Sequence, residues 1–362
     1  MNKPFEPVAL PLHEIDYKRI IGLVARANTM LARYDGLLQG IVNPTLFLSP
    51  LTSKEAVLSS RIEGTQATLD EVLAYEAGDK KNGSLGTDIQ EILNYRTSLM
   101  MVTEHVHDYP ITLNLLLQLH KNLLNTVRGR NKSPGCFRTD QNWLGSPGCS
   151  IEEATYIPPS PLRLKDHLEN WQKYIEFDDF DAITQTAIIH AQFELIHPFK
   201  DGNGRIGRLL IPLVLYRKKI ISAPMFYISS YLEANRDNYY HQLNAISNNG
   251  DWNGWIEFFL NAVIHQADDN ATRVRAIFEL YAEMKKTIEE ATHSQFVIRI
   301  LDAIFATPIF TTTHFVIQTK IPKQSAFPLL KKLKDLNIVR PIREASGRTP
   351  AVLTFPALLD II

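Results

Sequence analysis

Two consecutive stretches of the sequence would be apolar around most of their circumference if they formed helices. Residues 181–196 read DAITQTAIIHAQFELI, and residues 205–218 read RIGRLLIPLVLYRK. A helix that is apolar on every face is stable only where every face is buried. We therefore expect other elements to surround this pair of helices, and we expect Pro212 to kink the second one.

Helical periodicity also runs through most of the remaining sequence, whereas alternating strand patterns are scarce, so we predict a mainly α fold. Amphipathic helices are expected at residues 17–34, 52–62, 88–105, 112–127, 237–248 and 252–279. Residues 128–161 differ, because glycines and prolines punctuate them. We expect a long loop there with room for one hairpin. Loops of that length inside a compact domain are usually functional or disordered.

From about Ser294 the sequence reads as a separate small module. Three helical stretches and two short β-type runs follow one another at residues 296–306, 312–318, 324–336, 338–342 and 351–355. Three helices and a hairpin of this size predict a winged helix. The chain is divided accordingly into an N-terminal helical region at 1–105, a central region with trailing helices at 106–290 and a winged-helix module at 291–362.

Composition excludes several classes of protein. The 362 residues carry 38 basic and 39 acidic side chains, a net charge of −1, which argues against a polycation for nucleic acid. Two cysteines, Cys136 and Cys149, support neither a disulfide scaffold nor a four-ligand zinc site. The N-terminal residues lack the apolar stretch of a secretory signal, and no apolar run approaches the ~18–20 residues that span a bilayer. We expect a soluble cytoplasmic protein that does not bind membranes.

Between the two apolar helices lies the segment HPFKDGNGRIGR at residues 197–208, which concentrates polar chemistry. Gly202 and Gly204 allow backbone N–H groups to converge, and they open a helix whose N-terminal dipole attracts anions. Arg205 and Arg208, three residues apart, share a face of that helix and offer forked donors for phosphate oxygens. These features predict a phosphate-binding site.

Two further residues of the segment suit catalysis on a phosphate. Asp201 is a hard oxygen ligand of the kind that holds Mg²⁺ together with a substrate phosphate. His197 has the side chain whose ordinary pKa best suits proton transfer near neutral pH. The segment therefore predicts phosphoryl chemistry with His197 as the base and Asp201 as the metal ligand.

Two other phosphate-binding motifs fit the segment poorly. Residues 202–207 match G-x-G-x-x-G formally, but a dinucleotide fold needs a preceding strand and an acidic residue about 20 positions later. A helical pattern precedes the glycines instead, and residues 203–232 contain no Asp or Glu. A Walker phosphate loop is excluded because no Lys-Ser or Lys-Thr follows the glycines.

The segment matches the signature HxFx(D/E)GNGRxxR at every defined position, so the chain resembles the Fic family. The resemblance implies a Fic-type helical bundle with a β-hairpin flap, and an enzyme that transfers AMP from ATP to a protein hydroxyl. It implies that His197 is the catalytic base, that Asp201 holds Mg²⁺, and that ATP contacts Gly202, Asn203, Gly204, Arg205, Ile206, Gly207 and Arg208.

The resemblance also assigns residues outside the signature. Residues 151–159 resemble the flap, which aligns the target by strand addition, and place Thr155 and Tyr156 at target docking. Residues 138–145 resemble the approach to the flap. Tyr239, Tyr240 and Asn248 are expected at the adenine end of the nucleotide.

A second motif resembles an inhibitory helix found in one class of this family. Ser59 to Gly64 read SSRIEG and fit (S/T)xxxE(G/N), with Ser59 and Glu63 on one helix face. The resemblance implies that Glu63 pairs with Arg208 in the place of the ATP γ-phosphate, since carboxylate and phosphate compete for one guanidinium. It also leaves open that the enzyme removes AMP.

The C-terminal module leaves two interpretations open. Residues 314–348 contain eight basic residues and two acidic ones, in a chain that is otherwise near neutral. A basic helix and wing suit contact with DNA phosphates, but the same face suits dimerisation or capture of a protein substrate. The alternative functions are a DNA-binding transcriptional regulator with a minor Fic activity, and a transferase of another group such as UMP. Expected partners are ATP, a target protein with Ser, Thr or Tyr, the chain itself as target, DNA, and a second copy in a homodimer.

Overall fold

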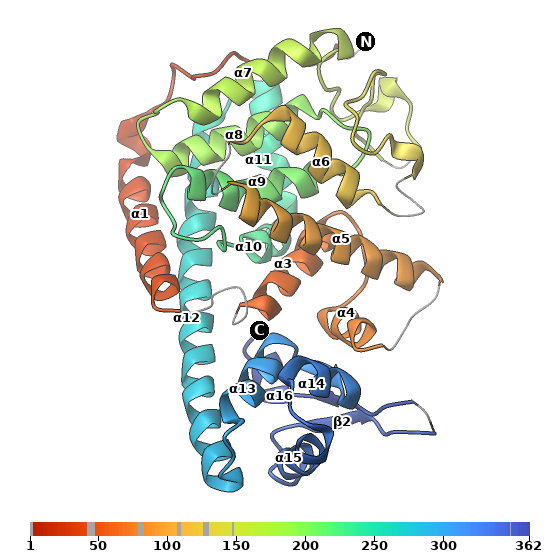
Figure 1. The fold of residues 1–362 in the computed structure, drawn as a ribbon. Coiled ribbons are helices and arrows are strands. Elements are labelled where there is room, and N and C mark those ends of the chain that lie inside the picture. The colour runs from red at the N-terminus through yellow and green to blue at the C-terminus, as the bar shows by residue number, and fades with distance from the viewer. Residues whose placement is uncertain are drawn as a thin grey trace.

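The computed structural model describes residues 3–41, 48–78, 83–106, 110–125, 130–146, 148–347 and 349–362. These residues form a helical body and a smaller C-terminal module, and the long helix α12 (Trp252–Thr292) runs through both (Figure 1). Most described residues are helical, and the described part of the chain contains three short strands. The predicted mainly α fold is confirmed.

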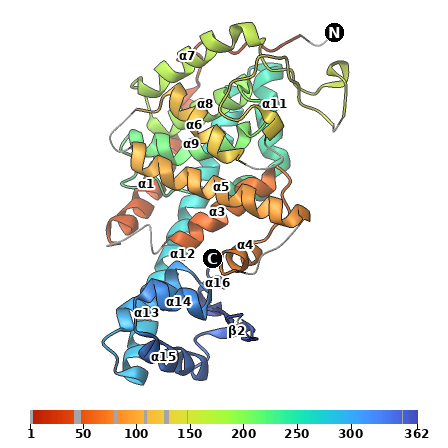
Figure 2. The same cartoon turned by 45° about the vertical axis from the view of Figure 1, so that its right-hand side comes forward.

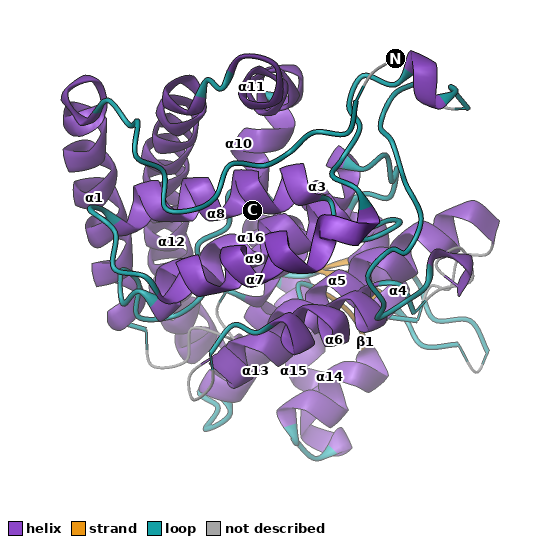
Figure 3. Ribbon diagram, turned by 90° about the horizontal axis from the view of Figure 1, so that it is seen from above, coloured by secondary structure: helices purple, strands orange, loops and turns teal. Residues whose placement is uncertain are grey.

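The helical body is built from two groups of helices. The first group consists of α1 (Tyr17–Gln39), α3 (Ser49–Ile62), α4 (Leu69–Glu76), α5 (Gly83–Val106) and α6 (Leu113–Leu123). The second consists of α7 (Leu164–Glu176), α8 (Ala182–Ile196), α9 (Asn203–Arg217), α10 (Ser229–Ala234), α11 (Arg236–Asn249) and α12. Seen from above, these helices surround α8 and α9 (Figure 3).

The helix α8 is the centre of the body, as its sequence predicts. Nearly all of its side chains are buried. Two tryptophans from neighbouring helices donate hydrogen bonds to its carbonyls, Trp171 to Ile189 O at 2.9 Å and Trp255 to Ala187 O at 2.9 Å. The buried helix α9 continues through Pro212 as one element.

Three helices of the body are not predicted from periodicity. The helices α4 and α10 are too short to show a repeat, and α7 directly follows the proline-rich loop. A different signal was present for α4. Thr68 accepts a hydrogen bond from the Glu71 backbone, and the Glu71 side chain accepts one from the Thr68 backbone. This capping box begins a helix whatever its length.

The flap at residues 151–159 lies in the long loop between α6 and α7. Its Tyr156 forms an isolated antiparallel bridge with Leu144, with N···O distances of 2.8 and 3.2 Å in the two directions. Residues Ile151–Glu153 form a single 3₁₀ turn. The hairpin is therefore a loop closed by one bridge, because this segment is rich in residues that favour turns over a strand ladder.

The C-terminal module contains four helices and a three-stranded antiparallel sheet of order β1-β3-β2. Its elements are α13 (Val297–Ala306), β1 (Ile309–Thr311), α14 (Thr312–Thr319), α15 (Lys323–Asp335), β2 (Arg340–Arg343), β3 (Val352–Thr354) and α16 (Pro356–Leu359). The two predicted β runs overlap β2 and β3, and β1 is an additional strand. Arg348, counted among the basic residues of the module, lies outside the described residues.

The module packs on the first group of helices as well as on α12. Leu73 of α4 and Ala77, which caps that helix, form a small apolar cluster with Ile309 and Val352 of the sheet. Figure 2 shows α4 beside the module. The Arg273 side chain on α12 donates to Ile361 O at 2.7 Å. Among the described residues, no helix has both the length and the hydrophobicity needed to cross a bilayer.

Candidate active site

The loop at residues 197–202, here called the signature loop, turns the chain from α8 into α9. His197 ends α8 in the left-handed region, at φ 48°. Buried Arg138 fixes this turn by donating to His197 O at 2.9 Å and to Pro159 O at 2.5 Å, while its backbone N–H donates to Pro198 O at 2.9 Å. Burial lowers the pKa of Arg138 to about 10, so its charge persists at neutral pH. One side chain therefore joins the signature loop to the end of the flap.

A second buried side chain holds the other end of the signature loop. His120 on α6 accepts a hydrogen bond from Gly135 N–H at its Nδ1, at 3.0 Å, so its Nε2 carries the proton and donates to Asp201 O at 3.0 Å. Its ring stacks on Phe199 with centroids 3.8 Å apart. Burial lowers the pKa of His120 to about 4, which keeps this tautomer neutral.

Asn203 closes the signature loop from within. Its Oδ1 accepts from Phe199 N–H at 2.8 Å, and its Nδ2 donates to Phe199 O at 2.9 Å. The side chain is 1% exposed. The Asn203 amide therefore shapes the loop and is not free to contact a ligand.

The imidazole of His197 is oriented and neutral. Its Nδ1 lies 3.3 Å from Glu194 O, and a carbonyl can only accept, so Nδ1 carries the proton. The other nitrogen, Nε2, then has a free lone pair. Burial lowers the pKa of His197 to about 4. At neutral pH the ring is therefore unprotonated at Nε2.

The Glu63 side chain, at the end of α3, packs against the first turn of α9. Gly202 begins this helix at φ 80°, and a Cβ atom at Gly204 would lie only 2.2 Å from Glu63 Oε1. The glycine is therefore needed for the close approach of the carboxylate. A helix N-terminus favours a negative charge at this place.

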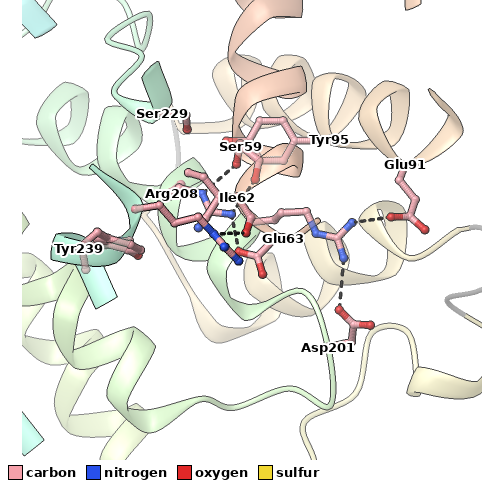
Figure 4. Close-up of polar contacts among 12 residues, drawn as sticks. Ser59, Ile62, Glu63, Glu91, Tyr95, Asp201, Arg208, Ser229 and Tyr239 are labelled. Atoms are coloured by element: carbon pink, nitrogen blue, oxygen red, sulfur yellow. Dashed lines mark hydrogen bonds and ion pairs between the residues drawn. The ribbon is translucent and has the colours of Figure 1, made fainter. Parts of the chain in front are cut away.

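Arg208 binds the end of α3, which carries Glu63 (Figure 4). Its Nε donates to Ser59 Oγ at 2.9 Å, and its Nη2 donates to Ser59 O at 2.9 Å and to Glu63 Oε1 at 2.6 Å. Its Nη1 is buried and has no hydrogen-bond partner among the described residues. Burial alone would raise the pKa of Glu63, but Arg208 outweighs it and holds that pKa below its ordinary value.

Most of α3 is part of the core, whereas the side chain of Glu63, directly after its last residue, is partly exposed. Ser59 and Ser60 are fully buried. Glu55 accepts hydrogen bonds from the Ser229 backbone at 3.1 Å and from its hydroxyl at 2.6 Å. At the tip, Arg236 on α11 donates to Ile62 O at 3.0 Å, whereas the Glu63 side chain is 32% exposed.

Arg205 is engaged differently from Arg208. Its guanidinium lies 3.2 Å from Glu91 on α5 and 3.2 Å from Asp201 Oδ1 (Figure 4). The Asp201 side chain is 42% exposed. No group of three or more His, Cys, Asp or Glu side chains in the described ranges could hold a metal ion. A divalent cation here would therefore depend on Asp201 and on oxygens of a ligand.

Ile206 and Gly207, which the sequence also assigned to ATP contact, lie where α9 packs against α8. Ile206 is fully buried. A Cβ atom at Gly207 would lie 2.2 Å from Glu194 Oε1, which is buried without a hydrogen-bond partner in the described part of the chain. Burial raises the pKa of Glu194 to about 8. Sequence reasoning missed Glu194, although the one acidic residue inside an otherwise apolar helix was a visible signal.

The residues expected at the adenine end separate into two positions. Tyr239 is 1% exposed, and its hydroxyl lies 2.9 Å from His190 Nε2, so it is part of the core. Tyr240 is 36% exposed. Asn248 lines a cavity of about 240 Å³ together with Thr155 and Tyr156 of the flap. The fold thus brings the flap and the end of α11 together.

Comparison with known sequences places most of this site within one family. The profile described as the Fic/DOC family N-terminal region matches residues 21–104, and that of the Fic/DOC family matches residues 110–215. A probable protein adenylyltransferase of Aquifex aeolicus is 25% identical over 197 residues, covering 53% of this chain and 56% of its own. A protein adenylyltransferase Fic of Drosophila mojavensis is 30% identical over 183 residues, covering 50% and 32%. The chain thus spans about half or less of the length of these relatives.

Comparison with solved structures supports the fold. A Fic family protein from Desulfovibrio desulfuricans G20 matches with a TM-score of 0.59 and 19% identity, over 98% of each chain. A Fic domain containing signaling protein from Bacteroides thetaiotaomicron matches with a TM-score of 0.55 and 19% identity, over 69% of this chain and 97% of the other. Such low identities bear on the fold and not on the chemistry.

Proposed function

Because the chain belongs to the Fic/DOC family, we propose that it transfers AMP from ATP to Ser, Thr or Tyr hydroxyls of a protein, its own included. One observation carries the proposal. The Glu63 carboxylate lies on the N-terminal turn of α9 and on Arg208 Nη2, at 2.6 Å. A carboxylate that rests on a helix N-terminus and an arginine occupies a site that suits a phosphate equally well.

His197 is the proposed base. Its Nε2 takes the proton of the target hydroxyl, the hydroxyl oxygen forms a bond to the α-phosphorus of ATP, and the bond from that phosphorus to the bridging oxygen breaks to release pyrophosphate. The neutral ring and the hydrogen bond from Nδ1 to Glu194 O support this role. Proton transfer to a positioned base contributes about 10²–10⁴-fold to rate.

The N-terminal turn of α9 is the proposed cradle for the phosphates. Backbone N–H groups at residues 202–204 face negative charge that develops in the transition state. Arg208 would hold the terminal phosphate, and its unpartnered Nη1 supports this assignment. Arg205 has an indirect role, because its Nη2 lies 3.2 Å from Asp201 Oδ1 and orients that carboxylate.

The site fits Mg²⁺ bound in part by the substrate. Mg²⁺ in nucleotide sites commonly uses one or two carboxylates and completes its shell with phosphate oxygens and water. Asp201 is partly exposed and its backbone is fixed by His120, so it could hold the ion. When bound, the ion would neutralise charge on the phosphates.

Glu63 is the proposed inhibitor of transfer. It would compete with the terminal phosphate of ATP for Arg208. Because the body of α3 is buried and hydrogen-bonded through Glu55, release by withdrawal of the helix would disrupt the core. We infer that release consists of a rotation of the Glu63 side chain, which is partly exposed. The same carboxylate could orient a water molecule for removal of AMP.

Intact mass after incubation with Mg²⁺ and ATP tests the proposal. Wild type, Glu63→Gly and Glu63→Gly/His197→Ala are compared, with Asp70→Gly as an exposed carboxylate control. We expect an added AMP mass that is largest in Glu63→Gly, absent in the double variant, and unchanged by Asp70→Gly. Transfer by the double variant would reject His197 as the base. Addition of UMP from UTP instead would reassign the transferred group.

A second candidate function concerns the C-terminal module. Lys323 and Lys331 on α15 and Arg340 on β2 are exposed, and they support the proposal that a winged helix here contacts DNA. A mobility-shift series in salt tests it, because neutralisation of several phosphates makes affinity fall steeply with salt. Weak binding that does not respond to salt would favour dimerisation or substrate capture.

A further inference from the structure

The N-terminal segment before α1 is bound across the helical body as a strap, defined here as residues 3–12. Asn170 on α7 holds its middle through two hydrogen bonds, to Leu10 N and Leu10 O, both at 2.9 Å. Gln192 on α8 donates to Val8 O at 2.8 Å. The strap lies outside both family profiles, the first of which begins at residue 21.

The beginning of the strap reaches the flap. Phe5 N–H donates to Ile157 O at 2.8 Å, and the Phe5 ring lies 5.9 Å from the ring of Tyr156. Glu6 lies 3.3 Å from His167 on α7. The N-terminal end of the chain is therefore near the flap, far from the start of α1 (Figure 1).

These contacts make the strap a wall of the cavity between the flap and α11. The cavity of about 240 Å³ is lined by Lys3, Phe5, Ala154, Thr155, Tyr156, Ile157, Ser247 and Asn248. One lining residue, Tyr156, is tied to the helix that leads into the signature loop, because its hydroxyl donates to Leu195 O at 2.5 Å, two residues before His197.

Two side chains that line the cavity suit contact with a purine base. Phe5 offers an aromatic face that is partly exposed, and stacking on an aromatic ring is the usual way in which proteins hold an unpaired base. Asn248 offers an amide, which can donate to and accept from the edge of adenine. Together they provide a stacking surface and an edge contact.

We propose that Phe5 contacts the base of the bound nucleotide, so that the strap forms part of the substrate site as well as a support for the flap. This inference rests on the proposed use of ATP. It adds a residue that lies outside the matched family regions, and it predicts that affinity for ATP depends on the strap.

Equilibrium binding to the full chain tests the assignment, with Glu63→Gly as the parent so that Glu63 does not compete. Calorimetry with Mg²⁺ compares ATP with inorganic tripolyphosphate, which has the phosphates and no base. Phe5→Ala should weaken ATP binding on the order of tenfold and leave tripolyphosphate unchanged, since it removes the stacking surface for the base and no contact to the phosphates. Phe5→Trp, which keeps an aromatic ring, should bind ATP with the affinity of the parent.

A matched variant in the same strap is Val8→Ala. Val8 is 51% exposed and does not line the cavity, so neither ligand should be affected. Equal weakening of both ligands by Phe5→Ala, or no change in ATP binding, overturns the assignment while the proposed function stands. If the parent binds ATP no more tightly than tripolyphosphate, the base adds no affinity, and the assignment of Phe5 to the base fails. If the parent binds neither ligand, both proposals fail.

Discussion

The signature loop and the flap are both irregular segments that Arg138 contacts, but the other contacts that hold them differ. The signature loop is tied at one end by Arg138, at the other by His120, and internally by Asn203. The flap is tied to Leu144 by one bridge and to α8 by the Tyr156 hydroxyl. Its C-terminal end also receives hydrogen bonds, at Ile157 O from Phe5 and at Pro159 O from Arg138, whereas Thr155 is exposed.

The difference follows from what each segment does in the proposed reaction. Atoms that exchange a proton or stabilise charge must be positioned to a fraction of an ångström, because small displacements are costly in rate. A segment that pairs with a target backbone can adjust as the target arrives. We therefore expect changes at the signature loop to affect stability and chemistry, and changes at the flap to affect target binding.

Arg138→Ala should have the largest effect. It removes charged hydrogen bonds to buried carbonyls, including those of His197 and Pro159, and should lower the free energy of unfolding by about 2–4 kcal/mol. Urea unfolding measures this. The control is Arg163→Ala, whose side chain is 57% exposed and should change stability by less than about 0.5 kcal/mol. If both variants lost the same free energy of unfolding, the signature loop would not depend on Arg138 in the way that we infer.

Glu194 and Glu63, both near Arg208, should change the free energy of unfolding in opposite directions as pH rises. Burial raises the pKa of Glu194 from 4.5 to about 8, so stability that is fully present below 4.5 is lost as pH rises through 8. Glu194→Gln removes this loss and should stabilise the fold on the order of a few kcal/mol at pH 8 relative to pH 4.5.

Glu63→Gln provides the matched comparison. Arg208 holds the pKa of Glu63 below its ordinary value against the effect of burial, so Glu63 stabilises the fold above pH 4.5 and loses this effect as pH falls below that value. The variant should be less stable than wild type at neutral pH, with a difference that narrows in acid. Thermal unfolding from pH 2 to pH 9 measures both variants. The assignment would be contradicted if the stability difference from wild type changed with pH in the same direction for Glu194→Gln and Glu63→Gln.

Trp143→Ala tests the approach to the flap and should have a smaller effect. The side chain is 41% exposed and donates one hydrogen bond, to Cys149 O at 3.0 Å. We expect a loss in stability of about 1 kcal/mol or less, with transfer of AMP to water unchanged and transfer to protein weakened. A fall in transfer to both acceptors would mean that the flap also positions the nucleotide.

Thr155→Ala should have the smallest effect on stability, within about 0.5 kcal/mol, because the exposed hydroxyl makes a single hydrogen bond within the described part of the chain, to Leu144 O at 3.0 Å. The rate with saturating target should be unchanged, and the KM for a protein target should rise. Steady-state kinetics with the target varied at fixed ATP separates the two. A changed rate at saturating target would place Thr155 among the groups that act in chemistry.

The sequence by itself determined the mainly α fold, the buried pair α8 and α9, and the concentration of polar residues between them. These features are local, since periodicity, glycine spacing and neighbouring charges are all read along a short stretch of chain. The family match at residues 110–215 is consistent with this.

Only the tertiary structure decided what each polar side chain is bonded to. Arg205 and Arg208 appear equivalent in the sequence, yet the fold pairs Arg205 with Glu91 and pairs Arg208 with Glu63 at the end of α3. The Asn203 amide, assigned to ATP from the sequence, bonds to Phe199 instead. The partners Arg138, His120 and Glu91 come from elements 59 to 114 residues away in the chain. Hydrogen bonds depend on distance in space, which a one-dimensional pattern does not encode, and so the roles of these side chains emerged only when the helices were packed.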